Sequence, residues 1–592
     1  MRPSAMMLES IRSIRPPSVV LAFAKKLAVV LLKKFAVVAL IAALFSPHFS
    51  REVAVAPGEL DPTFGNGGKV TTDFAGQRDQ AFALAVQPNQ KIIVAGAAIT
   101  ASGQTSDFAL ARFNADGSLD ASFGVAGKVT TDFAGGPDVI VALALQPDGK
   151  IVVAGTACVH PELGCSTASV SNTNGLDFAL ARYNSNGSLD ISFGIGGKVT
   201  TDFSGGGDGA FAVAIQADGK IVAGGTTRVP NPVRHNFDFA LARYNENGSL
   251  DTGFGTGGKI VSDFLDDDDM ITSLAVSPDG KIIAAGWSYT TTTRDYALAR
   301  YTANGSLDPT FGSGGRVTTD FFSTASSRRR DVIAAIALQP DGKLVAVGSS
   351  ESDTPAEYMK FTFARYNVNG QLDTSFGSGG KASASISDYD DQATSVAIQS
   401  DGKILVGGMA GGIFRFGLDF FGAVPSAAGN PNFALVRLNT DGSLDTSFGI
   451  GGKVNTDFFG GIDAARIALQ ADGKVVAAGA ASRSLINRDL TDADFALARY
   501  EGTRTAPSGP VITGASISGK MLFITGQGFS DEAKLLLDGV KQKTANDEQS
   551  PATTLIARKA GKLIERGQTV MLQVQNSDGA LSNRFAFTRP AN

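Results

Sequence analysis

The chain has 592 residues, of which 70 are glycine and 38 are phenylalanine; 43% are hydrophobic and 18% are charged. This composition suits several folded domains and excludes a disordered or a collagen-like chain. Three histidines, two cysteines and one tryptophan leave few residues for a zinc site, a haem site or a network of disulfides. The formal net charge is -5, and the part after residue 56 holds 44 basic and 55 acidic side chains. That acidic excess argues against binding to nucleic acid or to an anionic membrane.

Residues 1–56 have the pattern of an export signal. A basic front ends at Lys34, an uncharged apolar run extends from Phe35 to Phe45, and small residues follow at 54–56. The apolar run is too short to span a bilayer, so we expect a signal peptide or N-terminal leader. Pro57 would hinder cleavage directly after the small residues, and retention as an anchor is the alternative. We expect a secreted or cell-surface protein with no transmembrane segment in its mature chain.

The two cysteines lie close together in one loop. Cys158 and Cys165 are near enough in sequence to bridge, and outside the cytoplasm such a pair is expected to oxidise. We therefore predict a disulfide that closes this loop, with two free thiols as the alternative.

A short element, Leu-Asp-x-x-Phe-Gly, recurs seven times along the chain. Its copies start at Leu60, Leu119, Leu189, Leu250, Leu307, Leu372 and Leu444. Each unit also contains four strand-sized segments, which are illustrated by residues 68–74, 141–146, 150–155 and 177–183. A tight turn such as Pro147-Asp148-Gly149 joins the second segment to the third. A repeat of this length with no helical stretch is typical of a β-propeller.

The ends of the repeat region indicate how the ring closes. The region begins with a strand-like segment before any apolar run, and it stops after residues 494–500 with its last unit one strand short. We expect residues 69–74 to lie beside residues 496–500 and complete the last blade, which leaves no strand edge unpaired. The predicted fold is all-β: a seven-bladed propeller over residues 57–500 with four strands per blade, closed by the N-terminal strand.

Three motifs of the repeat point to a known family. Leu-Asp-x-Ser-Phe-Gly, Pro-Asp-Gly-Lys and Phe-Ala-Leu-Ala-Arg-Tyr-Asn together resemble the bacterial delta-60 repeat over residues 60–500. The resemblance implies a β-propeller of an exported protein, and it implies no common enzymatic activity.

The pattern changes after the last unit. Residues 501–510 are predicted to be a linker, and residues 511–592 a separate domain. Within that domain, residues 520–529 and 570–579 resemble an immunoglobulin-like TIG (IPT) domain, which implies a small Ig-like β-sandwich. Such domains act as spacers or contact modules.

One acidic position recurs in every unit, shortly before the tight turn. Its members are Asp79, Asp138, Asp208, Asp269, Asp331, Asp391 and Asp463. If the apolar segment is the innermost strand, these carboxylates lie near one mouth of the axial channel and form a ring that calcium would suit. We favour the alternative, a structural role in which each carboxylate accepts backbone N–H bonds. No other cofactor is expected.

A second repeated pattern looks like half of a calcium loop but has an arginine at the first ligand position. Asn114 to Asp120 and its relatives place oxygen ligands at alternate positions, whereas Arg112 and its equivalents would repel a cation. We interpret these arginines as forks paired with a repeat carboxylate, beside an Asx turn.

The loops before Phe-Ala-Leu-Ala-Arg differ most between units, and loops on a rigid scaffold are where binding sites evolve. We expect them to share a face with the repeated aspartates. Their candidate binding residues are aromatic or basic: Trp287, Tyr289, Arg328, Arg329, Arg330, Phe414, Phe416, Phe420 and Phe421. Exposed aromatics there would suit a protein or carbohydrate ligand. The alternative is that the phenylalanines fold back under their own loop.

These features predict a binding and interaction scaffold, and no catalytic residues are assigned. His160 and His235 lack a patterned serine or cysteine partner. Enzymatic activity stays open in one form, a polysaccharide lyase or hydrolase in which Asp266 to Asp269 would face Arg328 to Arg330. A purely structural envelope protein is the third interpretation.

Overall fold

The computed structural model describes most of the chain after the leader. The described residues are 55–74, 76–99, 105–163, 165, 175–203, 206–229, 236–264, 267–290, 293–321, 330–351, 358–414, 425–458, 465–482, 493–502, 510–527, 529–547, 553–577, 582 and 585–590. The predicted leader therefore lies outside them, apart from its last two residues. Within the described residues, no helix is long and apolar enough to cross a membrane.

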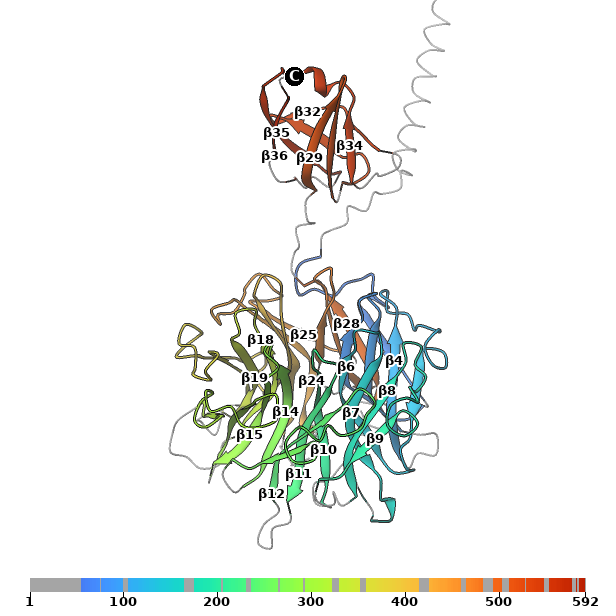
Figure 1. Ribbon diagram of the computed structural model, residues 1–592, viewed down its shortest axis with the longest axis vertical. Helices are drawn as coiled ribbons and strands as arrows, with labels where there is room; N and C mark the ends of the chain where they lie inside the picture. The colour runs from blue at the N-terminus through green and yellow to red at the C-terminus, as the bar shows by residue number, and fades with distance from the viewer. Residues whose placement is uncertain are drawn as a thin grey trace, which may run out of the picture. The chain divides into compact units, whose positions relative to one another are not determined.

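The repeat region forms seven four-stranded antiparallel sheets, which are the blades (Figure 1). Blade 1 comprises β2 (Asp79–Val86), β3 (Ile92–Ile99), β4 (Ser106–Phe113) and β5 (Lys128–Thr131). Blade 2 comprises β6 (Asp138–Leu145), β7 (Ile151–Cys158), β8 (Leu176–Tyr183) and β9 (Lys198–Thr201), and blade 3 comprises β10 (Asp208–Ile215), β11 (Ile221–Val229), β12 (Asn236–Tyr244) and β13 (Lys259–Ser262). Blade 4 comprises β14 (Asp269–Val276), β15 (Ile282–Thr290), β16 (Thr293–Tyr301) and β17 (Arg316–Thr319).

The remaining blades follow the same strand order. Blade 5 comprises β18 (Asp331–Leu338), β19 (Leu344–Ser350), β20 (Lys360–Tyr366) and β21 (Lys381–Ala384). Blade 6 comprises β22 (Asp390–Ile398), β23 (Ile404–Phe414), β24 (Pro425–Leu438) and β25 (Lys453–Thr456). Blade 7 comprises β26 (Arg466–Leu469), β27 (Val475–Ser482), β28 (Ala493–Tyr500) and, from the other end of the region, β1 (Lys69–Thr72).

The first strand of each blade contacts the first strand of the next, and β26 contacts β2, so the blades form a closed ring. Closure depends on β1, which pairs antiparallel with β28, with Lys69 opposite Ala498 and Thr72 opposite Phe495. The predicted seven-bladed propeller closed by an N-terminal strand is confirmed. Closure gives the last blade its fourth strand, so the outer edge of every blade is a strand of only four residues.

Apolar side chains from neighbouring blades make one core at each junction. Between blades 1 and 2, Phe108 and Leu110 of β4 pack with Ile140 of β6 and Val153 of β7. The second and third strands are buried on both faces, which explains why they read as continuous apolar runs. Gly155 is required because a Cβ there would lie 1.9 Å from the main-chain oxygen of Val139, where the pairing of β6 with β7 shifts register.

The C-terminal part is a two-sheet β-sandwich. One sheet has the order β29 (Val511–Ser518), β30 (Met521–Gln527), β34 (Thr554–Ala557), β33 (Ala545–Asn546), and the other has β32 (Val540–Lys541), β31 (Lys534–Leu537), β35 (Thr569–Gln575), β36 (Phe585–Thr588). Buried residues of both sheets, including Leu522, Leu555, Leu535 and Leu572, form one core. Among the described residues, the short helices are η1 (Pro161–Leu163) in the propeller and η4 (Ala560–Lys562) in the sandwich.

Candidate functional site

The strand order gives the propeller two different faces. The turn face carries the turn between the first and second strands and the bend between the third and fourth. The loop face carries the connection between the second and third strands and the link from the fourth strand to the next blade. Loop length varies on this face: two residues (291–292) separate β15 from β16, and seventeen (159–175) separate β7 from β8.

The turn face is held by a repeated arginine–aspartate latch. In blade 2, Arg182 Nε lies 2.8 Å from Asp190 Oδ2, and Arg182 Nη1 donates to the main-chain oxygen of Glu246 in blade 3. The guanidinium also lies 4.6 Å from the ring centre of Phe193. One buried side chain thus ties its own bend to the next blade, and the arginine fork inferred from the sequence is confirmed.

The latch recurs in all seven blades with Nε to Oδ2 distances of 2.6–2.9 Å. Its pairs are Arg112–Asp120, Arg182–Asp190, Arg243–Asp251, Arg300–Asp308, Arg365–Asp373, Arg437–Asp445 and Arg499–Asp61. A lysine such as Lys474, 2.6 Å from Asp61, adds a second positive charge. Burial by itself would raise the pKa of Asp61, but hydrogen bonds from Lys474 and Thr63 and the charge of Arg499 outweigh it and lower the pKa to about 2.

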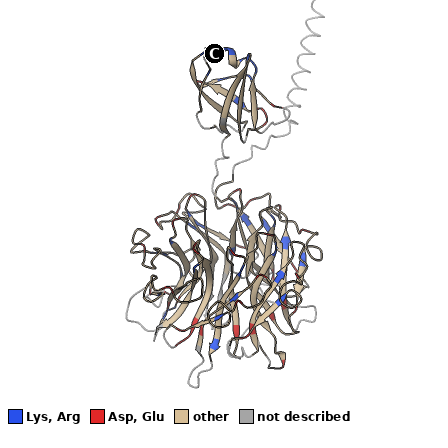
Figure 2. Cartoon of the chain, viewed as in Figure 1, with Lys and Arg blue, Asp and Glu red and all other residues tan. Residues whose placement is uncertain are grey.

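The loop face has the opposite arrangement, because three carboxylates meet at each of several blade junctions. Between blades 1 and 2 these are Asp107 of β4, Asp132 in the link after β5, and Asp138 at the start of β6. One oxygen from each lies within 4.8 Å of the others. The other junction groups, each with its carboxylates inside the same limit, are Asp73–Asp79–Asp494, Asp177–Asp202–Asp208, Asp238–Asp263–Asp269 and Asp295–Asp320–Asp331. Figure 2 shows acidic segments near the strand ends that border the loops.

The repeated aspartates predicted to form a ring each belong to such a junction or to its equivalent. The six that are described, at positions 79, 138, 208, 269, 331 and 391, are 0–2% exposed. Each accepts a backbone N–H from the preceding link, for example Phe74 N to Asp79 Oδ2 at 2.6 Å. Asp463 lies outside the described residues. The structure thus distributes these side chains over separate blade junctions.

Burial and neighbouring acids act together on these groups. Burial raises the pKa of Asp138 to about 8; the N–H groups of Phe133 and Cys158 oppose this rise, and the charges of Asp132 and Asp107 add to it. The pKa of Asp79 and of Asp208 is raised to about 7, and that of Asp269 to about 8, again chiefly by burial. Aspartates on the two faces therefore have pKa values shifted in opposite directions.

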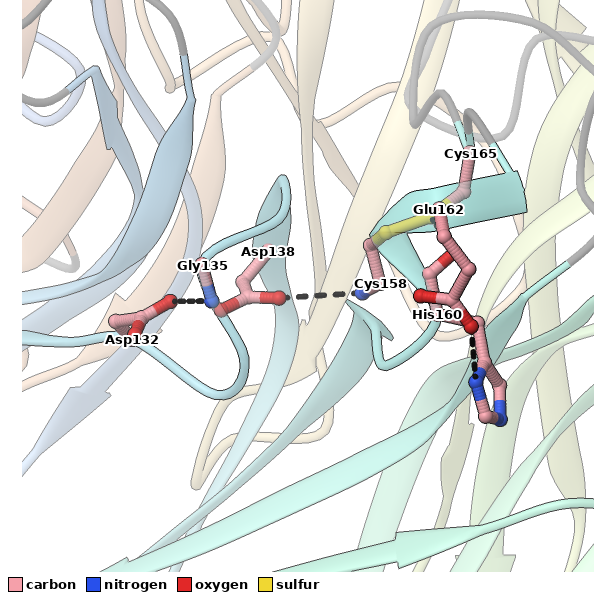
Figure 3. Close-up of a disulfide and its surroundings, with 7 residues drawn as sticks. All are labelled: Asp132, Gly135, Asp138, Cys158, His160, Glu162 and Cys165. Carbon is pink, nitrogen blue, oxygen red and sulfur yellow. Dashed lines mark hydrogen bonds and ion pairs between the residues drawn. A yellow bond between two sulfur atoms is a disulfide. The ribbon is translucent and has the colours of Figure 1, made fainter.

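Cys158 and Cys165 form a disulfide at one of these junctions (Figure 3). Cys158 N donates to Asp138 Oδ1 at 3.2 Å, so the disulfide starts beside a junction carboxylate. In the loop that it closes, His160 Nδ1 lies 3.0 Å from Glu162 Oε1. A Cβ on Gly136 would lie 2.6 Å from Cys158 Sγ, so the link packs directly against the disulfide.

Trp287 does not offer a contact surface, which corrects the expectation of an exposed aromatic. It is 4% exposed, and the guanidinium of Arg294 lies 4.2 Å from its ring centre. The same guanidinium lies 4.9 Å from the ring of Tyr289, which is half-buried. The ring of Trp287 therefore serves to hold the guanidinium of Arg294. Cation–π contacts with Trp287 and Tyr289 compensate for the burial of the charge of Arg294.

The remaining candidates fall partly outside the described residues. Arg330 is described and lies 4.0 Å from Glu351. Arg328, Arg329, Phe416, Phe420 and Phe421 lie outside them, and the backbone of Phe414 is described as part of β23 but its side chain is not.

The structure adds two residues that sequence reasoning missed. Tyr358 and Tyr389 are 41% and 43% exposed, and their ring centres lie 5.4 Å apart. They precede the third strand of blade 5 and the first strand of blade 6, so only the fold brings them together. With Tyr289, Arg330 and Glu351 they form what we call the aromatic strip, on the loop face of blades 4–6.

Parts of the repeat region match the profile of a known protein family. Segments that match the profile described as "Domain of unknown function (DUF5122) beta-propeller" are 87–123, 146–157, 167–193, 216–254, 277–311, 339–376 and 422–448. The repeat region is therefore similar to the DUF5122 β-propeller family. No curated protein matches the chain.

Several solved structures are similar to this chain at low sequence identity. A fungal alcohol oxidase of the AA5 family, in complex with copper, is 12% identical, with 89% of this chain and 100% of that chain covered and a TM-score of 0.41. The β-propeller domain of the Trilobed protease from Pyrococcus furiosus is 9% identical, with 72% and 95% covered and a TM-score of 0.33. The polysaccharide lyase Uly1 is 11% identical, with 84% and 89% covered and a TM-score of 0.27.

Proposed function

We propose that this protein is an exported, non-catalytic interaction scaffold, secreted or held at the cell surface, which binds a protein or carbohydrate ligand through the loop face. The observation that carries the proposal is the aromatic strip. Its paired tyrosines, Tyr358 and Tyr389, are exposed, and the same face carries the opposite charges of Arg330 and Glu351, which lie 4.0 Å apart. Aromatic rings supply contact area, and flanking charged groups supply orientation, in both sugar and protein recognition.

The contrast between the faces supports this assignment. The turn face repeats one latch seven times, whereas the loop face varies in loop length and in exposed side chains. The buried inner-strand aspartates are out of reach of a polymeric substrate, which favours binding over a polysaccharide lyase or hydrolase.

Export and the role of the C-terminal sandwich rest on the sequence. The basic and apolar pattern of residues 1–56 and the resemblance to delta-60 repeats both support export. The resemblance of residues 511–592 to a TIG domain supports a spacer or contact role for the sandwich.

The test is a binding screen of the purified protein on a glycan array and against isolated envelope proteins. We expect a Tyr358→Ala/Tyr389→Ala variant to lose at least about tenfold in affinity for the ligand found. Ile195→Ser is the matched control, because Ile195 is 89% exposed on the turn face. If Ile195→Ser weakens binding and the tyrosine variant does not, the loop-face assignment is wrong. If neither screen yields a ligand, a purely structural role replaces the proposal.

A further inference from the structure

One position on the first strand of each blade is occupied by a small side chain in six blades and by an arginine in the seventh. In blade 1 this residue is Ala83, which pairs with the fourth residue of β3, Ala95; in blade 7 it is Arg466, which pairs with the fourth residue of β27, Ala478. The equivalent residues of blades 2–6 are Ala142, Ala212, Ser273, Ala335 and Ser395. Blade 7 therefore places a long cationic side chain where the other blades have alanine or serine.

The side chain of Arg466 reaches the blades on both sides of its own. Its Nε donates to the main-chain oxygen of Phe82 in blade 1 at 3.0 Å, and its Nη1 donates to the main-chain oxygen of Thr394 in blade 6. β26, which carries the arginine, contacts the first strands of both of these blades, β2 and β22. Because blade 7 itself separates blade 6 from blade 1 everywhere else, a side chain that bonds to both must lie on the axial side of the ring.

Within the part of the chain that the structure describes, the charge of Arg466 has no anionic partner. A guanidinium has five N–H donors; two of them donate to main-chain oxygens, and the others, including both on Nη2, make no hydrogen bond to a described residue. Burial lowers the pKa of Arg466 to about 10, and no carboxylate opposes this shift. By contrast, each latch arginine has an aspartate, and Arg294 lies against the rings of Trp287 and Tyr289. Charged groups inside a protein are as a rule paired, so the free donors of Arg466 point to an anionic ligand.

The axial side of the ring is accessible to solvent from the turn face. Arg466 is itself half-buried. The last two residues of each first strand are half-buried as well: 85–86, 144–145, 214–215, 275–276, 337–338, 397–398 and 468–469. Each first strand is covered by its own second strand and by the first strands on either side, so this exposure faces the axis. The first strands end at the turn face, and a small solute therefore reaches Arg466 from that face.

The free donors select the chemical class of the ligand. The terminal nitrogens of a guanidinium form a planar fork that matches two oxygens of a carboxylate or phosphate group. The alanines and serines at the six equivalent positions bring no charge to this level of the ring. The acidic excess of the chain after residue 56 disfavours a polyanion, which would have to lie along the protein surface, and so favours a small anion.

We propose that Arg466 binds one small oxyanion, through a carboxylate or phosphate group, on the axial side of the propeller. The anion accepts hydrogen bonds from the guanidinium nitrogens and compensates the positive charge where blades 6, 7 and 1 meet. The ligand enters from the turn face, whereas the aromatic strip lies on the loop face. The two sites are therefore separate, and neither proposal depends on the other.

The experiment titrates the full chain with sodium phosphate, sodium acetate or sodium chloride at constant ionic strength and follows the heat by calorimetry. We expect one equivalent of phosphate or of acetate per chain, and an increase in Tm, because a ligand of the native state stabilises it. Tighter binding of phosphate than of acetate identifies a phosphate group as the natural ligand, and the reverse order identifies a carboxylate. Chloride carries charge but cannot occupy both arms of the fork, so an equal response to chloride would overturn the proposal.

Matched variants assign the binding to Arg466. Arg466→Gln should abolish it, and Arg566→Gln, which removes an exposed arginine of the sandwich, should leave it unchanged. Arg466→Lys keeps the charge but loses the fork, so it should weaken binding at least about fivefold, and it provides the comparison if Arg466→Gln does not fold by circular dichroism. Equal binding by Arg466→Lys, Arg566→Gln and the unchanged protein would overturn the proposal. Failure of the unchanged protein to bind either oxyanion at concentrations up to about 50 mM would also overturn it.

Discussion

The two faces of the propeller use the same residue type, aspartate, in opposite electrostatic settings. At the turn face, Asp61 and its equivalents each receive an arginine and a lysine, and the pKa of Asp61 is lowered to about 2. At the loop face, Asp138 and its equivalents meet further acids, and the pKa of Asp138 is raised to about 8. One repeat can therefore stabilise ionised aspartates at one face with its own cations, while at the other face burial beside further acids favours protonated aspartates.

The largest predicted effect comes from breaking the latch that closes the ring. Arg499→Met should lower the free energy of unfolding by about 3–5 kcal/mol, because it leaves the carboxylate of Asp61 buried with one cation fewer. Lys474→Met is the control, since the lysine is more exposed and should cost about 1 kcal/mol or less. Urea unfolding followed by circular dichroism measures both, and equal losses would contradict the dominant role of the arginine.

Removal of the disulfide at the loop face should cause the next largest loss of stability. Cys158→Ala/Cys165→Ser opens a loop of eight residues and should cost about 2–3 kcal/mol through the entropy of the unfolded chain. Limited proteolysis should then cut between the two positions, where the unchanged protein resists. Identical cleavage and unfolding of both proteins would show that the disulfide adds no stability.

The ring and its turn-face latches could be predicted from the sequence, because their motifs recur in every unit. Seven copies of Leu-Asp-x-x-Phe-Gly and the missing strand after Tyr500 were enough to predict the ring and its closure by residues 69–74. The arginine fork could also be predicted. A calcium loop needs an oxygen ligand at its first position, whereas the repeat has a guanidinium there, which would repel the ion.

The loop face was less predictable for a physical reason. Asp107, Asp132 and Asp138 come from three elements of two blades, and only the three-dimensional packing brings their carboxylates together. Trp287 looked like a ligand contact, but the strand pairing that places Arg294 over its ring cannot be read from composition. Tyr358 and Tyr389 gave no signal, because each is a single aromatic in a different loop.

The two faces should respond to pH in opposite directions. The pKa of Asp79 rises from 3.8 to about 7 on folding, so the folded state binds this proton more tightly, and its stabilisation is lost as pH rises through about 7. Asp73 and Asp494 raise this pKa, whereas Phe74 N and Lys128 lower it. The pKa of Asp61 falls to about 2, so its stabilisation is lost as pH decreases from about 4 to 2.

The measurement is Tm in EDTA between about pH 2 and pH 9. We expect a maximum near pH 4–5 and a decline on both sides. A Tm that rises steadily from pH 5 to 8.5 in EDTA would contradict the electrostatics assigned to the loop face.

The smallest predicted effect is the change in stability caused by an Asp→Asn substitution, and it has opposite signs at the two faces. In EDTA at about pH 8, Asp132→Asn should stabilise the protein by about 0.5 kcal/mol, because it removes a like charge beside Asp107 and Asp138. Asp190→Asn, on the turn face, should destabilise it, because Arg182 then loses its ionised partner. Destabilisation by both substitutions would contradict repulsion among the junction acids.

The most direct test of the central claim is the difference in bound protons between the folded protein and the protein unfolded in urea, measured by potentiometric titration. At about pH 6, the raised pKa values of Asp79, Asp138, Asp208, Asp269 and Asp331 predict that the folded chain binds more protons than the unfolded chain. Near pH 3, the lowered pKa of Asp61 and its equivalents predicts that the folded chain binds fewer. Equal proton binding by the two states at both pH values would contradict the account of the two faces.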